Sequence, residues 1–422
     1  MLPTETPSDE PHATPDTTAG DANHDTADQN ANQDAATEDA TTHDATVTPY
    51  DVEGEVDYEK LLERFGADRL TDDQIGRFPD HPLLRRGTFY AGRDVDRYLA
   101  AAEAGERHSI VTGRGPSGSM HLGHVLPFYF AKRLQDATGA HVYVPLSDDE
   151  KFLAKNLSLD TIGEHTRDNL RDVLAVGFDP DRTTVVIDTL DADVLYPQAV
   201  RTADAITQST VDATYGDPET IGLSFYPAVQ AVHLLLPQLL HDPHPTLVPI
   251  AVDQDPHVRV CRDVAAKERF DVEKPGALLG KFLPSLSGPG KMSSSGDDPT
   301  IDLSDDRETI REKIDRYAYS GGRESLDAHR EHGGDPEVDV AYRYLHAFFE
   351  DDDETLEELA RDYRRGELLS GDLKARAADR IADFLEAHQR RREALGSLAT
   401  ALAPYRLSEH ERERLAPPTT LR

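Results

Sequence analysis

The sequence has a single cysteine, Cys261, no tryptophan and only ten lysines among its 422 residues. One cysteine excludes both a disulfide framework and a cysteine-based zinc site within the chain. No run of residues approaches the roughly 20 consecutive apolar side chains that a membrane-spanning helix needs. The first residues also lack the basic start and apolar stretch of a secretory signal. We therefore expect a cytoplasmic protein that has no membrane partner.

Positive charge is scarce as well, because 45 basic side chains face 80 acidic ones and give a formal charge of −35. A charge of this sign and size ordinarily argues against a nucleic-acid partner, whose phosphates repel carboxylates. In molar salt, however, the screening length falls to about 3 Å, so an acidic surface costs little. Few lysines beside abundant Asp, Glu and Arg resemble the composition of proteins from salt-loving archaea. The net charge therefore does not exclude a nucleic-acid substrate.

Residues 1–55 are predicted to form a disordered acidic tail. The first 50 residues contain eleven Asp or Glu and no Lys or Arg, among Ala, Thr, Asn and Pro. Such a segment cannot bury enough apolar surface to offset the entropy that ordering costs. A regulated docking arm is the functional alternative.

Residues 56–305 are predicted to form a Rossmann-like α/β domain with a doubly wound parallel sheet, because short β-like runs alternate there with helical stretches. The strands are expected at residues 108–112, 141–144, 183–187 and 247–252. From about residue 306 to 422 the apolar residues follow helical spacing and indicate a helical domain. Examples are Leu356, Leu359, Ala360 and Tyr363.

An H-x-G-H motif, His121 to His124, follows the first of these strands and a Gly-rich turn. In the first turn of a helix, His121 and His124 would share one face. Exposed backbone N–H groups and the positive end of the helix would suit a phosphate there. Gly123 would leave room for a flat base or ribose. Alone the motif is weak, since surface or metal-binding histidines fit it too, but no further zinc ligands stand at convincing spacing.

A second motif, K-M-S-S-S, follows the Gly-rich string at residues 288–290. A lysine in such a loop can swing its ammonium onto a polyphosphate while hydroxyls and backbone donors surround it. The plain alternative is a flexible surface loop. The residues are Lys291, Met292, Ser293, Ser294 and Ser295.

The two motifs in this order, with a helical region behind them, resemble class I aminoacyl-tRNA synthetases. Longer strings resemble in particular the tryptophanyl-tRNA synthetases of archaea and eukaryotes, over roughly residues 56–400. Tyrosyl relatives share the K-M-S loop, but the strings fit the tryptophanyl side better. They are T-G-R-G-P-S at 112–117, D-D-E-K at 148–151, P-A-V-Q at 227–230, D-Q-D-P at 253–256 and S-G-G-R at 320–323.

The resemblance implies activation of tryptophan by ATP with release of pyrophosphate, and then transfer to the 3′ end of tRNA(Trp). Mg²⁺ is expected on the β- and γ-phosphates, without a dedicated protein site. His121 and His124 would lie beside the α-phosphate, and Lys291 would meet the departing pyrophosphate. Met292 and Ser293 would shape the loop, and Ser294 and Ser295 would complete this catalytic motif. The residues expected to bind ATP are Thr112, Gly113, Arg114, Gly123, His124 and Lys291.

Selection of the amino acid is where the sequence departs from the family. The positions that hold the α-amino end of the substrate are kept, but those that usually meet the indole N–H are Val111 and Pro145, whose side chains accept no hydrogen bond. An unpaired donor in a buried pocket costs about 1–3 kcal/mol. A carbonyl, Tyr143 or Ser147 could substitute, or the chain is a diverged paralogue with a different amino-acid choice. The kept residues are Glu150, Gln230 and Gln254.

The helical domain at 306–422 corresponds by resemblance to the anticodon-binding domain, in which Arg323 and Glu324 would meet a splayed base edge. The acidic run 350–354 is better interpreted as a helix N-terminal cap than as a metal site. Relatives of this type are homodimers, so we expect a homodimer. Two other classes stay open: a tRNA-binding regulator built on a retired synthetase, and a small nucleotidyltransferase, which would not need the helical domain.

Overall fold

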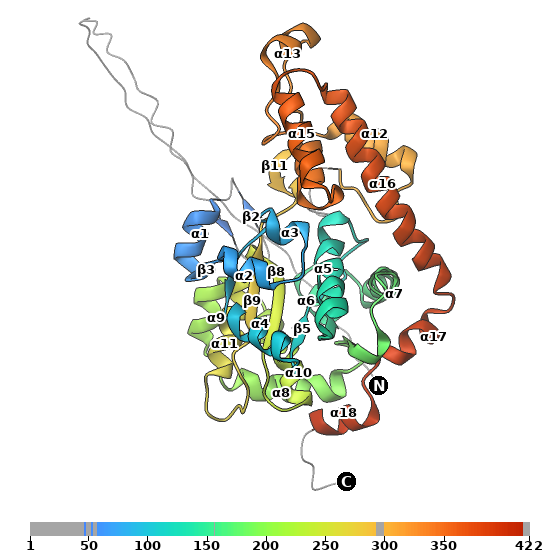
Figure 1. Cartoon of the computed structure of the whole chain (residues 1–422). Helices are drawn as coiled ribbons and strands as arrows, with labels where there is room; N and C mark the ends of the chain where they lie inside the picture. Colours follow the sequence, from blue (N-terminus) through green and yellow to red (C-terminus); the bar gives the residue numbers. More distant parts are fainter. Residues whose placement is uncertain (1–45, 48–51, 54–56, 156, 293–298, 417–422) are drawn as a thin grey trace, which may run out of the picture. The chain divides into compact units, whose positions relative to one another are not determined.

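The computed structural model describes residues 46–47, 52–53, 57–155, 157–292 and 299–416, which belong to one compact unit (Figure 1). Most of the predicted acidic tail, together with Ser293, Ser294 and Ser295 of the second motif, lies outside these described residues. Within the tail, β1 (Thr46–Val47) pairs antiparallel with β2 (Val52–Glu53).

A seven-stranded sheet forms the centre of the fold, in the order β3-β4-β9-β8-β5-β6-β7. The last five strands of this order are parallel, which confirms the doubly wound prediction, while β3 and β4 add an antiparallel edge that the sequence pattern did not indicate. The strands are β3 (Asp68–Arg69), β4 (Phe89–Arg93), β5 (Ser109–Val111), β6 (His141–Leu146), β7 (Thr183–Ile187), β8 (Thr246–Ala251) and β9 (Gly276–Gly280).

Each face of the sheet has its own apolar core, because successive strand residues point to opposite faces. Val142 and Val144 of β6 pack with the helices α5 and α7, whereas Tyr143 between them packs with α8, α10 and α11. The helices of this part are α1 (Tyr58–Phe65), α2 (Asp72–Arg77), α3 (Pro82–Arg85), α4 (Val95–Ala104), α5 (Leu122–Thr138), α6 (Asp148–Ala154), α7 (Leu159–Ala175), α8 (Ala192–Ala203), α9 (Gln208–Tyr215), α10 (Ile221–Leu240) and α11 (Asp255–Ala265).

By length and composition alone, helix α10 is long and apolar enough to cross a membrane. The sequence analysis expected no such segment. Its most apolar window is 72% buried inside the protein. The apolarity of α10 therefore matches its place in the core on one face of the sheet.

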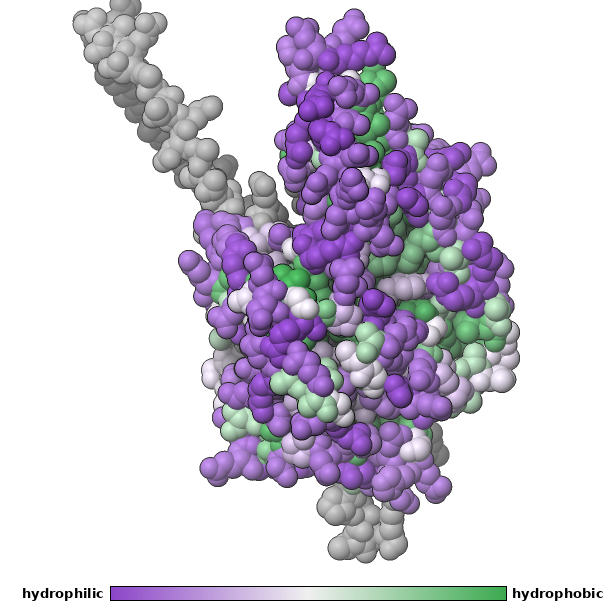
Figure 2. Space-filling view, in the orientation of Figure 1, coloured by the Kyte–Doolittle hydropathy of each residue, from purple (hydrophilic) through white to green (hydrophobic). Residues whose placement is uncertain are grey.

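The chain after β9 forms a short hairpin and then a helical region, as the spacing predicted (Figure 1). The region does not pack only on itself, since α16 contacts α7, and α18 contacts α8 and α10. Most of the face shown in Figure 2 is hydrophilic, in this region as in the sheet region. The elements are β10 (Pro284–Ser285), β11 (Gly288–Lys291), α12 (Arg307–Tyr317), α13 (Leu326–His332), α14 (Val340–Tyr344), a π-helical turn (Leu345–Phe349), α15 (Asp353–Arg364), α16 (Ser370–Ala394), α17 (Leu398–Leu402) and α18 (Glu409–Leu415).

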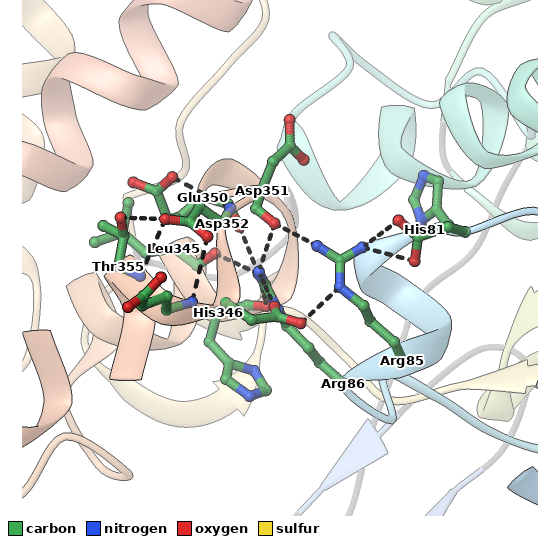
Figure 3. A network of polar contacts seen from close by, with 12 residues as sticks. His81, Arg85, Arg86, Leu345, His346, Glu350, Asp351, Asp352 and Thr355 are labelled. Atoms are coloured by element: carbon green, nitrogen blue, oxygen red, sulfur yellow. Dashed lines mark hydrogen bonds and ion pairs between the residues drawn. The ribbon is translucent and has the colours of Figure 1, made fainter. Parts of the chain in front are cut away.

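Two adjacent arginines tie α3 to the helical region (Figure 3). Arg86 Nη1 donates to the backbone oxygens of His346 and Glu350 at 3.0 and 2.6 Å, and Arg85 Nε donates to Asp353 at 3.0 Å. In the same acidic run, Asp352 accepts from the first backbone N–H groups of α15. The interpretation of this run as a helix cap is therefore confirmed.

Candidate active site

The carboxyl ends of the parallel strands meet at one edge of the sheet, where open α/β sheets usually bind ligands. A cleft of about 970 Å³ lies there and extends to the helical region. Both motifs contribute to its lining, although they are far apart in the sequence. The motif residues that line it are Thr112, Gly113, Arg114, His121, Gly123, His124, Lys291 and Met292.

The two histidines of the first motif stack at the start of α5. Their ring centroids lie 3.5 Å apart, and the backbone N–H of His121 donates to His124 Nδ1 at 3.3 Å. The prediction that both rings share one face is confirmed. Burial, with Arg114 and Lys291 nearby, lowers the pKa of His121 to about 3, and burial likewise lowers the pKa of His124. Both rings are therefore neutral hydrogen-bonding groups near pH 7.

Several nitrogens at this end of the cleft are buried without a partner. Both ring nitrogens of His121 and the Nε and Nη2 atoms of Arg114 have none among the described residues. Burial lowers the pKa of Arg114 to about 10, so its guanidinium stays charged at neutral pH. An unpaired buried cation is costly, so the unpartnered Arg114 nitrogens, with the one N–H of the neutral His121 ring, indicate an anionic ligand.

Two glycines of the cleft are needed for close packing. A Cβ atom on Gly113 would lie 2.6 Å from the backbone oxygen of Pro145, too close for any side chain. A Cβ atom on Gly123 would lie 3.2 Å from the His121 ring and 4.0 Å from Met292 Sδ. The space beside Gly123 that we expected a base or ribose to use is thus partly taken by His121, and Met292 joins the second motif to the first.

Lys291 has a partner that the sequence did not reveal. Its Nζ lies 2.5 Å from Asp253 Oδ2 and 5.1 Å from the centre of the Phe282 ring. Gln254 Nε2 donates to the same carboxylate at 3.1 Å. Asp253 is the first residue of the D-Q-D-P string, so this string could have identified Asp253 as a site residue from the sequence. The ammonium therefore sits in the cleft with a neutralising partner already beside it.

The expected amino-acid residues line the same cleft, together with Val111 and Pro145, and we call this group of residues the amino-acid end of the cleft. Glu150 forms an ion pair with Lys151, and Gln230 Oε1 accepts a hydrogen bond from Tyr226 at 2.8 Å. All three expected residues, Glu150, Gln230 and Gln254, therefore line one cleft, with Gln254 also bonded to Asp253.

The two side chains suggested as substitute acceptors for the indole N–H differ in position. Ser147 lines the cleft, whereas Tyr143 is fully buried and packs in the core beneath the sheet. The sequence analysis also missed three lining or supporting residues of this end: Tyr226 and His257, which line the cleft, and His233, which is buried behind Gln230.

Arg323 and Glu324 lie in the helical region, just before α13, and both are exposed. They do not line the cleft described above. Arg323 Nε donates to the backbone oxygen of Gly333 at 2.8 Å, which holds the side chain in place. Among the residues that the structure describes, no group of three or more His, Cys, Asp or Glu is arranged to hold a metal ion.

Comparison with known proteins agrees with this geometry. The family model for class I tRNA synthetases (W and Y) matches residues 103–386. "Tryptophan--tRNA ligase 2" of Halobacterium salinarum is 62% identical over 369 residues, covering 87% of this chain and 96% of that protein. "Tryptophan--tRNA ligase" of Saccharolobus solfataricus is 41% identical over 357 residues, covering 82% and 92%.

Solved structures agree as well. The tryptophanyl-tRNA synthetase from Giardia lamblia matches with a TM-score of 0.77 at 36% identity, over 84% of this chain and 96% of that chain. The tryptophanyl-tRNA synthetase from Aeropyrum pernix matches with a TM-score of 0.74 at 29% identity, over 86% and 97%. The chain belongs to the class I aminoacyl-tRNA synthetases, in the family that comprises the tryptophan and tyrosine enzymes.

Proposed function

We propose that this synthetase is a tryptophan–tRNA ligase, which activates tryptophan with ATP and then transfers it to the 3′ end of tRNA(Trp). The observation that carries the proposal is the gathering of buried, unpartnered donors from Arg114 and His121 in one cleft with Lys291. The names of the similar proteins support the choice of amino acid.

In the first step, a carboxylate oxygen of the amino acid attacks the α-phosphorus of ATP. The bond between this phosphorus and the bridging oxygen breaks, and pyrophosphate leaves with the electron pair. Negative charge accumulates on phosphate oxygens, so placed donors and cations supply the acceleration. His121, His124 and Arg114 would donate to the α-phosphate region. Lys291 would leave Asp253 to meet the pyrophosphate.

Thr112, Gly113 and Gly123 would lie along the bound nucleotide, and only glycine fits at 113 because a side chain there would collide with Pro145. Mg²⁺, when bound, neutralises charge on the β- and γ-phosphates. We assign it to the phosphates themselves, because the described residues offer no cluster of ligands for it.

At the amino-acid end, the carboxylate of Glu150 would meet the α-ammonium group, with Gln230 and Gln254 beside it. The indole N–H would fall near Val111 and Pro145, where Ser147 is the lining side chain that can accept it. In the second step, the tRNA would be held through its anticodon by Arg323 and Glu324. We place the enzyme in the cytoplasm as a homodimer.

The test is amino-acid-dependent ATP–pyrophosphate exchange with all twenty amino acids in molar KCl. Exchange with tryptophan alone is expected. Exchange with another amino acid instead would favour the diverged paralogue that Val111 and Pro145 suggest, and exchange with none would favour the tRNA-binding regulator.

A further inference from the structure

The wall of the cleft near Lys291 carries positive charge to which the proposed function gives no role. Lys291 is the cation assigned to the departing pyrophosphate, and the carboxylate of Asp253 already neutralises it in part. The lysine and arginine side chains that line the cleft are Arg86, Arg114, Lys151, Lys281, Lys291 and Arg343.

These cations differ in whether a carboxylate neutralises them. Arg114 has no such partner, and the proposed function gives it the α-phosphate region. Lys281 and Arg343 form no ion pair with any described residue either, and no ligand is assigned to them so far. The neutralised cations are Arg86 with Asp353, Lys151 with Glu150, and Lys291 with Asp253.

The acids of the cleft do not compensate the two unpaired cations. Each described carboxylate that lines the cleft already has another cation as its partner. Two uncompensated positive charges on one wall of a cleft, in a chain with a net charge of −35, favour an anion that the described residues do not supply. The lining carboxylates are Glu150 with Lys151, Asp253 with Lys291, and Glu337 with Arg364.

Aromatic rings, and not an acid, hold the ammonium group of Lys281. Its Nζ lies 5.8 Å from the centre of the Tyr58 ring and 5.6 Å from that of the Tyr90 ring. An ammonium is attracted to a ring face within about 6 Å, and this attraction orients the charge without neutralising it. Partial burial, with Arg69 and Arg343 nearby, lowers the pKa of Lys281. Positive charges therefore gather at this place.

Tyr58 links this place to the second motif. Its hydroxyl accepts a hydrogen bond from the backbone N–H of Phe282 at 3.1 Å, and the Phe282 ring lies 5.1 Å from Lys291 Nζ. Burial raises the pKa of Tyr58, and the Phe282 N–H opposes this rise. The charge of Arg343 also opposes it, whereas the charge of Asp253 adds to it. The two unpaired cations are thus neighbours of the Lys291–Asp253 pair on this wall.

The proposed reaction supplies an anion of the required kind. The triphosphate of ATP would begin at the α-phosphate, beside His121 and Arg114, and would extend past Lys291 with its β- and γ-phosphates. Phosphate oxygens bind strongly to charged donors, and a guanidinium can hold two of them at once. One ammonium that already has a carboxylate partner does not match the several negative charges of a pyrophosphate group.

We propose that Lys281 and Arg343 bind the β- and γ-phosphates of ATP, and the pyrophosphate formed from them, as phosphate-binding residues outside both motifs. The inference rests on the proposed function for the use of ATP, but not for the choice of amino acid. Lys281 directly follows β9 and Arg343 lies in α14, so a bound pyrophosphate group would join the sheet to the helical region.

The contact should act on binding more than on the chemical step. The β- and γ-phosphates are charged both before and after the bond to the α-phosphorus breaks. Loss of an interaction that is equally strong in both states raises KM and leaves kcat unchanged. This expectation differs from that for His121, whose donor faces the charge that develops during the reaction.

The first test compares two nucleotides that differ only in these phosphates. Isothermal titration calorimetry of the intact protein in molar KCl with Mg²⁺ would measure the Kd of ATP and of AMP. Lys281→Gln and Arg343→Gln should each weaken ATP binding about five- to tenfold, as expected for a charged contact at a partly exposed site. The Kd of AMP should change less than about twofold.

This comparison needs no amino acid, so it separates the two ideas. ATP binding that neither substitution weakens, or equal weakening of ATP and AMP, would overturn the inference and leave the proposed function standing. Failure of the wild-type protein to bind ATP would overturn both.

The second test uses the kinetics of ATP–pyrophosphate exchange. Both Gln variants should raise the KM for ATP and for pyrophosphate, with kcat and the KM for the amino acid within about twofold of the wild-type values. Lys281→Arg and Arg343→Lys keep the charge and should restore most of the affinity. A higher KM for tRNA with an unchanged KM for ATP would show that the cations bind tRNA, and the proposal would be wrong.

A matched control separates this site from the net charge of the protein. Lys267 is exposed just after α11 and does not line the cleft, so Lys267→Gln removes the same charge elsewhere. It should change neither Kd nor any KM, and equal effects of Lys267→Gln and Lys281→Gln would overturn the proposal. Lys281 is itself exposed, so Lys281→Gln keeps the test valid even where Arg343→Gln lowers thermal stability.

Discussion

The two ends of the cleft differ in whether their buried polar side chains have hydrogen-bond partners within the protein. At the end built by the two motifs, ring nitrogens of His121 and guanidinium nitrogens of Arg114 are buried without partners among the described residues. At the amino-acid end, Gln230 Oε1 accepts a hydrogen bond from the Tyr226 hydroxyl and contacts His233 Nδ1, and His233 Nε2 contacts Asp188, of which only Oδ2 is buried without a partner among the described residues. The donors of the motif end thus find partners only when a ligand binds, whereas the side chains of the amino-acid end are already held by other side chains.

This difference has a physical reason. A triphosphate brings several negative charges and many acceptor oxygens, so waiting donors become satisfied when it binds. An amino acid is small and must be distinguished from nineteen others, so its site needs side chains already fixed in one orientation. Substitutions at the motif end should therefore act mainly on the rate of activation, and those at the other end on affinity for the amino acid.

The largest effect is expected for His121→Ala. Removing one preorganised donor to a developing oxyanion typically lowers kcat by about 10²–10³-fold. Steady-state ATP–pyrophosphate exchange measures this loss, and the KM for tryptophan should stay close to the wild-type value. A fall in amino-acid affinity with an unchanged kcat would contradict the division between the two ends.

Lys291→Ala should lower the exchange rate about tenfold or more, since it removes the cation that meets pyrophosphate. Lys291 is 36% exposed and already paired with Asp253, so we expect a smaller loss than at His121. Lys291→Arg keeps the charge and serves as the control. An exchange rate unaffected by Lys291→Ala would remove this lysine from the mechanism.

Arg323→Ala should separate the tRNA site from both ends of the cleft. We expect the KM for tRNA in aminoacylation to rise about tenfold, the usual scale for loss of a base contact, with pyrophosphate exchange unchanged. Arg316→Ala removes an exposed charge from the same region, where Arg316 stacks on Tyr317, and should change neither reaction. Equal effects of the two variants would argue for a nonspecific loss of charge.

The smallest effect concerns Asp149, behind the amino-acid end. Burial, with Asp188 beside it, raises its pKa from 3.8 to about 7. Because the folded state then holds the proton more tightly than the unfolded state, Asp149 lowers stability as the pH rises from about 4 to about 7.

Asp149→Asn should therefore raise Tm by about 2–4 °C at pH 8 and by less at pH 5. Thermal unfolding in molar KCl measures this difference, with the exposed Asp271→Asn as control. A gain of equal size at both pH values would show that Asp149 does not titrate as described.

Local patterns predicted a large part of the fold. Four of the five parallel strands, all except β9, the helix after the Gly-rich turn and the cap at Asp352 follow from periodicity and from residue chemistry, which act over a few residues. The β3–β4 edge and β9 escaped detection because β4 is specified by pairing with β9, far along the chain, and the two-residue β3 by pairing with β4. Strand pairing of this kind depends on the partner more than on propensity.

The two motifs, their order and the family resemblance could be read from residue types alone, because binding a triphosphate requires these residue types in any fold. The three-dimensional structure was needed to see that Asp253 neutralises Lys291, that the His121 ring takes part of the space beside Gly123, and that His233 lies between Gln230 and Asp188. The Lys291–Asp253 and His233–Asp188 contacts join segments distant in the chain, so their energies depend on buried neighbours that no local pattern contains.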